Sequence, residues 1–290
     1  MNRGLGILVR SMSVPTSGFA YGNVWQYHPR SDRHSKILCW AILFDLLRRD
    51  SPIARHIRAG KASFGINHTM RDFQHDRKKD LDFVVCRRGP DRTYLTSRRN
   101  PITGFSDMVG AYDIHLDDDD RSDLRALPRI PLTGVQSALV AMEAKAAMTE
   151  FAKARPRLYD ELNSSHLTIH GDTDSAVAAA FVLVNASTTF ISPLRAPFHI
   201  DAARPAPVTK HKQPQAAVSV IEKIEQLPRR AQPGVPGFDA VGLATIACAN
   251  DGTPVRLISG APSPQIGDAF HYDSFIERIE TIYAARFSGI

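Results

Sequence analysis

The most constraining feature of the chain is the segment "ALVAMEAKAAMTE" (residues 138–150), in which an apolar run ends in an acid and a base two positions apart. A short apolar run of this kind predicts a buried β-strand. Residues i and i+2 of a strand point to the same face, so Glu143 and Lys145 are expected to emerge together where the strand leaves the core. Such a pair is either an ion pair at a strand edge, which is the common case, or part of a site.

A helix and two strands are expected before this segment. Residues 36–52, "KILCWAILFDLLRRDSP", carry apolar side chains at helical spacing, and Ser51-Pro52 is expected to stop or kink the helix. Residues 62–70 and 80–88 are rich in β-forming residues and flank the polar turn "RDFQHDRKK", which predicts a β-hairpin. Residues 1–35 show no clear periodicity and are expected to form an irregular arm.

After the strand at 137–145, a helical stripe interrupted near Pro156 is expected. Residues 173–187 are predicted to begin as a short alanine-rich helix and to end in a buried strand. The remaining elements, which follow a basic, proline-rich linker, are a helix over 215–227, a strand over 238–251 and an amphipathic helix over 272–287. This order predicts an α/β protein with a mixed central sheet flanked by helices.

The length of 290 residues and an apolar content of 43% suffice for a full hydrophobic core. The expected organisation is an N-terminal arm (1–35), a core (36–192) and a C-terminal helix-strand-helix extension (193–290). The extension is expected to belong to the same domain. The apolar stripe of its last helix is a candidate surface for a homodimer.

Positive charge is concentrated in one part of the chain. The formal net charge is +6, and residues 29–99 hold 17 Lys or Arg against 8 Asp or Glu, a local balance of +9. A basic surface of this kind is typical of nucleic-acid binding, because contacts to phosphates release condensed counterions. The alternative is a solvated basic face that has no partner.

Three cysteines, Cys39, Cys86 and Cys248, lie far apart in the sequence and form neither a zinc pattern nor a disulfide framework. They are expected to be free thiols in a reducing cytosol. No apolar stretch reaches the roughly 18–20 residues of a membrane span, and the first residues lack a signal-peptide cleavage pattern. A soluble, cytoplasmic protein is therefore expected.

A second pair of acids lies on the neighbouring predicted strand. In "DLDFVV", Asp80 and Asp82 share one face, and the apolar residues that follow hold the strand in the sheet. One carboxylate from each of two adjacent strands can hold Mg²⁺, which accepts oxygen ligands and keeps several waters. A lysine beside them, such as Lys145, would orient or deprotonate a water and would stabilise negative charge on a phosphate.

The order "DLDFVV", a connection, "VAMEAK" and a helix rich in small residues resembles the PD-(D/E)xK nuclease superfamily, which includes many type II restriction endonucleases. The resemblance covers roughly residues 36–187 and implies an α-β-β-β-α-β core. It also implies that Asp82, Glu143 and Lys145 are the catalytic residues. The metal ligands would be the two acids and the backbone carbonyl of Ala144, with Asp80 as a further candidate. Asp45 corresponds to the glutamate that the family often has in its first helix, where it would support the ligands.

Two other polar segments lack the pattern of a metal site. The run Asp117–Asp120 lies in a long connecting region, lacks the features of a calcium loop and is expected to be a solvated acidic loop. The segment "NSSHLTIHGDTD" (163–174) lacks a metal-ligand pattern and is expected to be a polar loop. The side chains proposed to contact DNA are those of Lys78, Lys79, Lys153, Arg157, Ser165 and His166.

Two functions remain after these steps, since the chain has neither a G-x-S-x-G hydrolase motif nor a phosphate-binding loop. The first is a Mg²⁺-dependent endonuclease acting on double-stranded DNA, of the type II restriction class, in which Mn²⁺ can replace Mg²⁺. The second is a non-catalytic DNA-binding or defence-associated protein with a nuclease-like fold.

Overall fold

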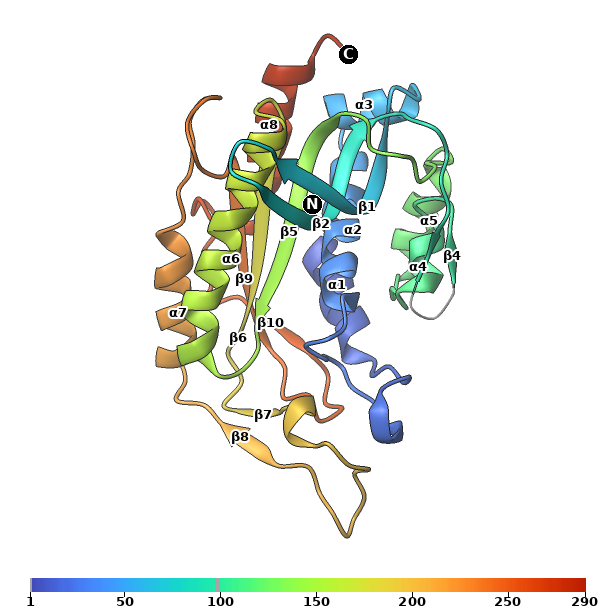
Figure 1. Cartoon of the computed structure of the whole chain (residues 1–290). Helices are drawn as coiled ribbons and strands as arrows, with labels where there is room; N and C mark the ends of the chain where they lie inside the picture. The colour runs from blue at the N-terminus through green and yellow to red at the C-terminus, as the bar shows by residue number, and fades with distance from the viewer. Residues whose placement is uncertain (1, 97–99) are drawn as a thin grey trace.

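A computed structural model describes residues 2–96 and 100–290 of the chain (Figure 1). The helices are α1 (Gly4–Ser13), α2 (Arg33–Leu47), α3 (Pro52–Arg58), α4 (Asp107–Ala111), α5 (Asp118–Ala126), α6 (Phe151–Asp172), α7 (Gln215–Glu225) and α8 (Tyr272–Phe287), with 3-10 turns η1 (Ala20–Gly22) and η2 (Pro193–Arg195). The strands are β1 (Ala62–Asp72), β2 (Arg77–Arg87), β3 (Tyr94–Leu95), β4 (Pro101–Ile102), β5 (Ala138–Ala147), β6 (Val177–Asn185), β7 (Thr189–Ile191), β8 (Val208–Lys210), β9 (Ala240–Ala247) and β10 (Arg256–Ile258).

A six-stranded sheet in the order β1-β2-β5-β6-β9-β10 forms the centre of the molecule. Its pairs β1–β2, β2–β5 and β9–β10 are antiparallel, whereas β5–β6 and β6–β9 are parallel. The expectation of a mixed α/β sheet flanked by helices is therefore confirmed. The strands β9 and β10, which come from the C-terminal part of the chain, complete the same sheet.

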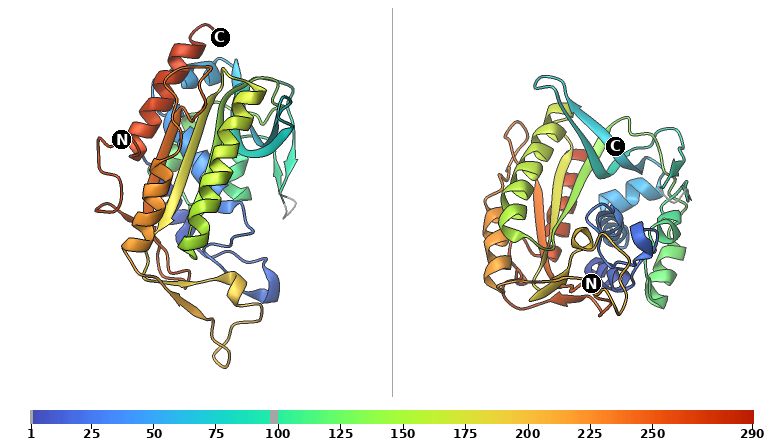
Figure 2. Two further views of the ribbon diagram at one scale, coloured as in Figure 1. Left: turned by 60° about the vertical axis from the view of Figure 1, so that its left-hand side comes forward. Right: turned by 60° about the horizontal axis from the view of Figure 1, so that its bottom comes forward.

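Helices cover both faces of this sheet (Figure 2). One apolar cluster lies between the sheet and α6 and α7, and a larger one lies between the sheet and α1, α2 and α8. In the part of the chain that the structure describes, no helix combines the length and the apolar character that crossing a membrane would require.

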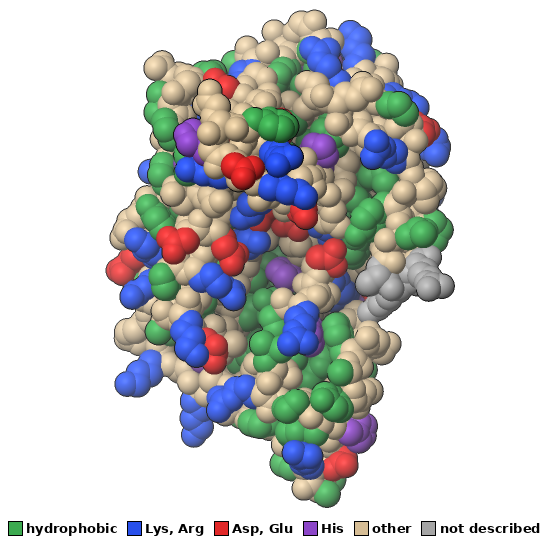
Figure 3. Space-filling view, in the orientation of Figure 1, with side chains coloured by type: hydrophobic (Ala, Val, Ile, Leu, Met, Phe, Trp, Pro, Cys, Tyr) green, Lys and Arg blue, Asp and Glu red, His purple; other side chains and the backbone are tan. Residues whose placement is uncertain are grey.

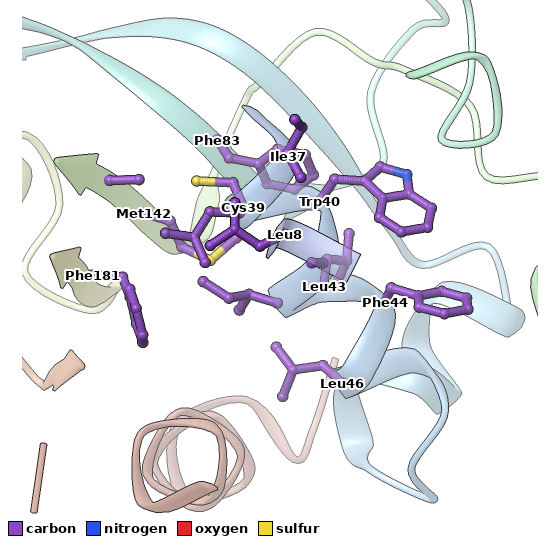
Figure 4. Close-up of a cluster of buried hydrophobic side chains, with 14 of the residues drawn as sticks. Leu8, Ile37, Cys39, Trp40, Leu43, Phe44, Leu46, Phe83, Met142 and Phe181 are labelled. Carbon is purple, nitrogen blue, oxygen red and sulfur yellow. The ribbon is translucent and has the colours of Figure 1, made fainter. Parts of the chain in front are cut away.

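Helix α2 lies at the centre of the larger cluster and is buried almost all the way round. Its side chains Ile37, Trp40 and Leu43 lie beside Phe83 and Met142 of the sheet (Figure 4). A fully buried apolar side chain of this size contributes about 1.5–3 kcal/mol. A helix that is apolar on every side is stable only inside a core, and this explains why the sheet, α1 and α8 surround it.

Several sequence predictions are confirmed. The hairpin of β1 and β2, the strand β5 and the helices α7 and α8 lie where the patterns place them. The first long helix stops before Ser51-Pro52, as predicted, since α2 ends at Leu47. Ser51 then caps a new helix, α3, by accepting a hydrogen bond from the backbone amide of Ala54.

Two predictions about helices are wrong. Residues 1–35 contain α1, which is missed because two of its first three residues are glycine and its amino end is capped from elsewhere in the fold. The carboxylate of Asp45 accepts the backbone N–H groups of Arg3 (2.8 Å) and Gly4 (2.7 Å). Helix α6 runs without interruption through Pro156, because Ala154 and Leu158 on either side are buried against the sheet.

Two further predictions assign the wrong type of secondary structure. Residues 176–180 are alanine-rich but belong to strand β6 and the residue before it, not to a helix. The strand lies between two parallel neighbours with every residue buried, and small side chains let helices approach both of its faces. The run Asp117–Asp120 is not a solvated loop, since Asp117 caps α5 and Asp120 is buried, paired with Arg3 and Arg10. Acidic residues are favourable at that end of a helix.

The segment "NSSHLTIHGDTD" is helical rather than a loop over most of its length, since α6 extends to Asp172. The apolar stripe of α8 is also not a free surface. Its side chains Phe275, Ile276, Ile279 and Tyr283 are buried in the chain's own core. The prediction that this stripe offers a surface for a homodimer is therefore wrong, and the homodimer itself stays a prediction.

The role of Asp45 as the cap of α1 can be tested by substitution. Replacing Asp45 with alanine should lower the free energy of unfolding by about 1–3 kcal/mol, because the amides of Arg3 and Gly4 lose a buried acceptor. Urea denaturation in EDTA measures this change. Asp50→Ala is the matched control, since Asp50 is exposed and pairs only with Arg55 among the described residues, and should change the stability by less than about 0.5 kcal/mol. Equal stability of the two variants would contradict the capping role of Asp45.

Candidate active site

The strands β2 and β5 separate where the predicted acids lie. Their last paired residues are Phe83 and Met142, and the same register would place Leu81 opposite Ala144. Instead, the backbone N–H of Ala144 donates a hydrogen bond of 3.0 Å to the Asp82 carboxylate. The N–H and C=O groups of a strand residue point to the same neighbour, so the Ala144 carbonyl is also directed into this gap.

A local distortion of the hairpin turns Asp82 toward the gap. Asn67 and Asp82, which the β1–β2 register would place opposite each other, are left out of that ladder. Asn67 has a left-handed backbone with φ of 48°, a conformation that asparagine tolerates better than most residues. Leu81 and Phe83 consequently contribute to apolar clusters on opposite faces of the sheet, although they are two residues apart.

The first turn of α2 holds the Asp82 carboxylate in place. Its Oδ1 atom accepts hydrogen bonds from the Nζ of Lys36 at 2.7 Å and from the Oγ of Ser35 at 2.8 Å. Burial alone would raise the pKa of Asp82, but the charge and hydrogen bond of Lys36 hold it below its usual value. Asp82 is therefore a fixed carboxylate anion.

Glu143 is almost completely buried, with 2% of its surface exposed. Its Oε1 atom lies 2.8 Å from Lys145 Nζ and 3.7 Å from Lys79 Nζ. Its Oε2 atom has no hydrogen-bond partner among the described residues. Burial, followed by the nearby charge of Asp82, raises the pKa of Glu143. This carboxylate is held on one oxygen and unsatisfied on the other.

Lys145 bridges the strand and the neighbouring helix. Its Nζ atom lies between Glu143 and Glu161 of α6, 3.5 Å from the latter. Burial alone would lower the pKa of Lys145, but the charge of Glu143 and its hydrogen bond raise it above the usual value. Lys145 is therefore a cation and a hydrogen-bond donor at neutral pH.

The side chains around this gap form a charge-balanced cluster, hereafter the carboxylate–lysine cluster: Asp82, Glu143, Glu161, Lys36, Lys79 and Lys145. Three acids face three lysines. In the middle of the face that Figure 3 shows, acidic and basic side chains are intermixed. A solvated pair at a strand edge would not be buried in this way, so the simplest alternative for Glu143 and Lys145 does not describe their surroundings.

A cavity of about 390 Å³ opens over the cluster. Asp82, Ala144 and Lys145 contribute to its wall, and the exposed Arg30 and Arg157 lie at its edge. His34 also lines it, and burial lowers the pKa of His34 to about 4, so this imidazole is neutral at pH 7.

The donors fit a hard cation better than a soft one. In residues 2–96 and 100–290 no group of three or more His, Cys, Asp or Glu side chains is arranged to hold a metal. Two carboxylates and the Ala144 carbonyl remain, and Mg²⁺ is commonly bound by one or two carboxylates, waters and substrate phosphates. The unsatisfied Oε2 of Glu143 is an observation that such a cation would explain.

The structure brings some of the predicted residues together and separates others. Asp80 is exposed and accepts a hydrogen bond from Thr69, outside the carboxylate–lysine cluster. Asp45 lies at the end of α1 and does not contact Asp82 or Glu143 through any hydrogen bond or ion pair that the described residues show.

The residues proposed to contact DNA fall into three groups. Lys79 belongs to the cluster, and its Nζ donates to the Glu161 carbonyl at 2.7 Å. The side chains of Lys78, Lys153 and Arg157 are exposed. Ser165 and His166 are buried in α6 and present no surface to a partner. Arg98 and Arg99 of the predicted basic region lie outside the described residues.

Lys36, Ser35 and Glu161 were not predicted as site residues. Lys36 stands at the start of a run that is apolar on every helical face, and a lysine at such a position needs a buried counter-charge. That signal could have identified Lys36, whereas nothing in the sequence around Glu161 distinguishes it from other exposed helical acids.

No known relative identifies the chain: no protein-family model, curated protein or solved structure matches it.

The Lys36–Asp82 pair generates a test of the cluster. Lys36→Met should lower the free energy of unfolding by up to about 3–5 kcal/mol in EDTA, because it leaves the partly buried Asp82 carboxylate without its counter-charge. The double variant Lys36→Met with Asp82→Asn should recover most of the loss, since neither charge remains. Urea denaturation of the three proteins measures both effects, and a double variant no more stable than Lys36→Met would contradict the pairing.

Glu143 generates a prediction about pH. Because folding raises the pKa of Glu143, the folded state binds more protons than the unfolded state. The free energy of unfolding therefore falls as pH rises from about 4.3, the pKa of an unperturbed glutamate, through the pKa of Glu143 in the folded state. Glu143→Gln should therefore be more stable than the wild type at pH 7, and this advantage should shrink toward pH 4. Thermal unfolding across pH 4–8 measures it, with exposed Glu150→Gln as control. A gain that does not depend on pH would contradict the assignment.

Proposed function

We propose that the chain is a metal-dependent endonuclease that hydrolyses phosphodiester bonds in double-stranded DNA, of the type II restriction class. The observation that carries this proposal is the gap between β2 and β5. The carboxylates of the partly buried Asp82 and the buried Glu143 lie there with the Ala144 backbone and Lys145, next to a cavity with basic side chains at its edge.

The order of the elements supports the proposal. Helix α2 is followed by β1, β2, β5, α6 and β6, with α3 and the segment 88–137 as insertions. This order agrees with the α-β-β-β-α-β core that the PD-(D/E)xK resemblance implies. The two acids lie on the second and third strands of that series, and the lysine lies two residues after the second acid.

The ligands for Mg²⁺, or for Mn²⁺ in its place, would be the carboxylates of Asp82 and Glu143 and the carbonyl of Ala144. When bound, such an ion supplies Lewis-acid polarisation of the phosphate and lowers the pKa of a water. Lys36 and Ser35 keep the Asp82 carboxylate oriented toward the gap, and the Ala144 N–H fixes its second oxygen.

Lys145 acts as a cation rather than as a base in this arrangement. Its raised pKa keeps it protonated, so it donates hydrogen bonds to a phosphate oxygen and stabilises the negative charge that grows there during attack by water. Glu143 and Glu161 position its ammonium group. Arg30 and Arg157 at the edge of the cavity provide exposed cations for backbone phosphates, and Lys153 and Lys78 are further exposed cations on α6 and β2.

One observation favours a second function. The three lysines of the carboxylate–lysine cluster balance its three acids. A buried ion-pair network of this kind can have a purely structural role, without any part in catalysis. A DNA-binding or defence-associated protein that keeps a nuclease-like fold without catalysis would have such a cluster. The two proposals differ in whether the DNA is cut when Mg²⁺ is added.

Cleavage of plasmid and phage DNA with Mg²⁺, with Mn²⁺ and with EDTA tests the proposal. Asp82→Asn and Glu143→Gln should abolish cleavage and keep DNA binding, because each removes a charged ligand at nearly constant shape. Lys145→Ala should cut about 10²–10³-fold more slowly, the usual cost of removing one donor that stabilises charge in the transition state. Lys145→Arg should also be impaired, since the guanidinium is planar and larger.

Lys61→Ala, which alters an exposed lysine directly before β1, is the matched control and should cut at the wild-type rate. DNA binding by all variants without Mg²⁺-dependent cleavage by the wild type would favour the non-catalytic function. Full activity of Asp82→Asn or Glu143→Gln would contradict the assignment of these residues to the active site.

A further inference from the structure

A second cavity, of about 360 Å³, lies beside the cavity over the carboxylate–lysine cluster. The two cavities share Tyr27, Pro29, Ala146 and Arg157 in their walls. Ala146 directly follows Lys145 on β5, so the shared wall begins one residue from the proposed catalytic lysine. A volume of this size lies within the range of about 300–1,000 Å³ that is typical of small-molecule sites.

The floor of this second cavity is apolar and partly aromatic. Met148, Ala154 and Phe190 are buried beneath it, and the half-buried Tyr27 forms one side. The rings of Tyr27 and Phe190 meet edge to face, with centroids 6.3 Å apart and planes at 62°. Leu194 of η2, which is 54% exposed, stands at the opposite rim. Such a floor suits a flat, weakly polar group.

The rim of the same cavity is basic. It carries Lys153, Arg157 and Arg195, and its carboxylate, Glu150, lies 3.8 Å from Lys153. Arg195 is held in place because it donates a hydrogen bond of 3.1 Å to Thr209. The formal charge of the lining is thus +2. An apolar floor under a positive rim is complementary to a planar group that carries an anion.

We infer that this cavity binds one unstacked nucleotide of the DNA substrate, with its base on the floor beside Tyr27 and its phosphate at the basic rim. The inference rests on the proposed function, because the shared wall places the next phosphate of the strand toward Lys145. A base inside a duplex cannot reach the floor, so the nucleotide has to leave the stack. Stacking on an aromatic side chain compensates for part of the lost base stacking.

Fluorescence of 2-aminopurine deoxyriboside 5′-monophosphate, titrated into the whole protein in EDTA, tests the inference without metal or cleavage. The wild type should quench the probe to saturation, and the nucleoside without phosphate should bind more weakly. Tyr27→Leu should weaken binding by about 5- to 150-fold, the equivalent of about 1–3 kcal/mol for one stacked base. The matched control is Tyr21→Leu, an exposed tyrosine of the same arm outside the cavity.

Two further variants keep the test decisive if Tyr27→Leu folds poorly. Leu194→Asp alters an exposed side chain at the rim and should weaken monophosphate binding by placing a carboxylate there. Arg195→Ala should weaken binding of the monophosphate and not of the nucleoside, whereas Arg204→Ala, on the same segment but outside the cavity wall, should change neither.

The outcomes separate this inference from the proposed function. Absence of quenching, or equal binding by Leu194→Asp and the wild type, overturns the inference even if the protein cuts plasmid DNA with Mg²⁺. Saturable quenching that is lost in these variants supports the cavity even if no DNA is cut, in which case the proposed nuclease activity fails alone. Competition by inorganic phosphate as strong as that by the nucleotide would show that the rim binds phosphate only, and would overturn the inference.

Discussion

A lysine in the first turn of a helix that is buried on every side must have a counter-charge, and Asp82 is the counter-charge of Lys36. This pair connects the central helix to the sheet at the place where β2 and β5 separate. The carboxylate satisfies three donors there, from Lys36, Ser35 and the Ala144 backbone. The ladder between the strands can therefore end while the Ala144 N–H and the Asp82 carboxylate both keep partners, although the Oε2 of Glu143 in the same gap has none among the described residues.

The balance of charge around this gap affects what can bind. Asp82, Glu143 and Glu161 are already matched by three lysines, so a divalent cation alone would add two uncompensated positive charges in a partly buried place. Under the proposed function, phosphates of the DNA would supply the missing negative charge. Cation and DNA would then bind with positive coupling, each increasing the affinity for the other to the same degree.

The sequence was most informative where a pattern has a local cause. The i, i+2 rule placed Glu143 and Lys145 on one face of β5, and the β-rich run after Asp82 placed that residue on the neighbouring strand. Helix α2 followed from apolar residues that recur on every face of a helix after Lys36. These predictions depend on residues that are close in sequence, so no knowledge of the remaining fold was required.

The predictions that failed depend on contacts between distant residues. The amino end of α1 is capped by Asp45, and Gly4 fits there because a Cβ atom would lie 2.0 Å from the Tyr272 hydroxyl and 2.8 Å from Asp45. The same contacts give Asp45 a structural role that its position in the predicted first helix did not reveal. Strand β6 is alanine-rich because helices pack on both of its faces and leave room only for small side chains. This packing depends on the order of the strands in the sheet, and it outweighs the high helix propensity of alanine.

The arm that was expected to be irregular contributes most directly to the surface around the site. Tyr27 and Pro29 line both cavities, and residues 30–32 line the one over Asp82. The arm is fixed by Asn250, whose side chain accepts the amide of Tyr27 and donates to its carbonyl, at 3.0 Å each. Asn250 follows β9, a strand of the C-terminal part of the chain. The walls of both cavities therefore require that the N-terminal arm is packed against the C-terminal part of the chain. The site depends on the complete sheet rather than on the segment 36–187 alone.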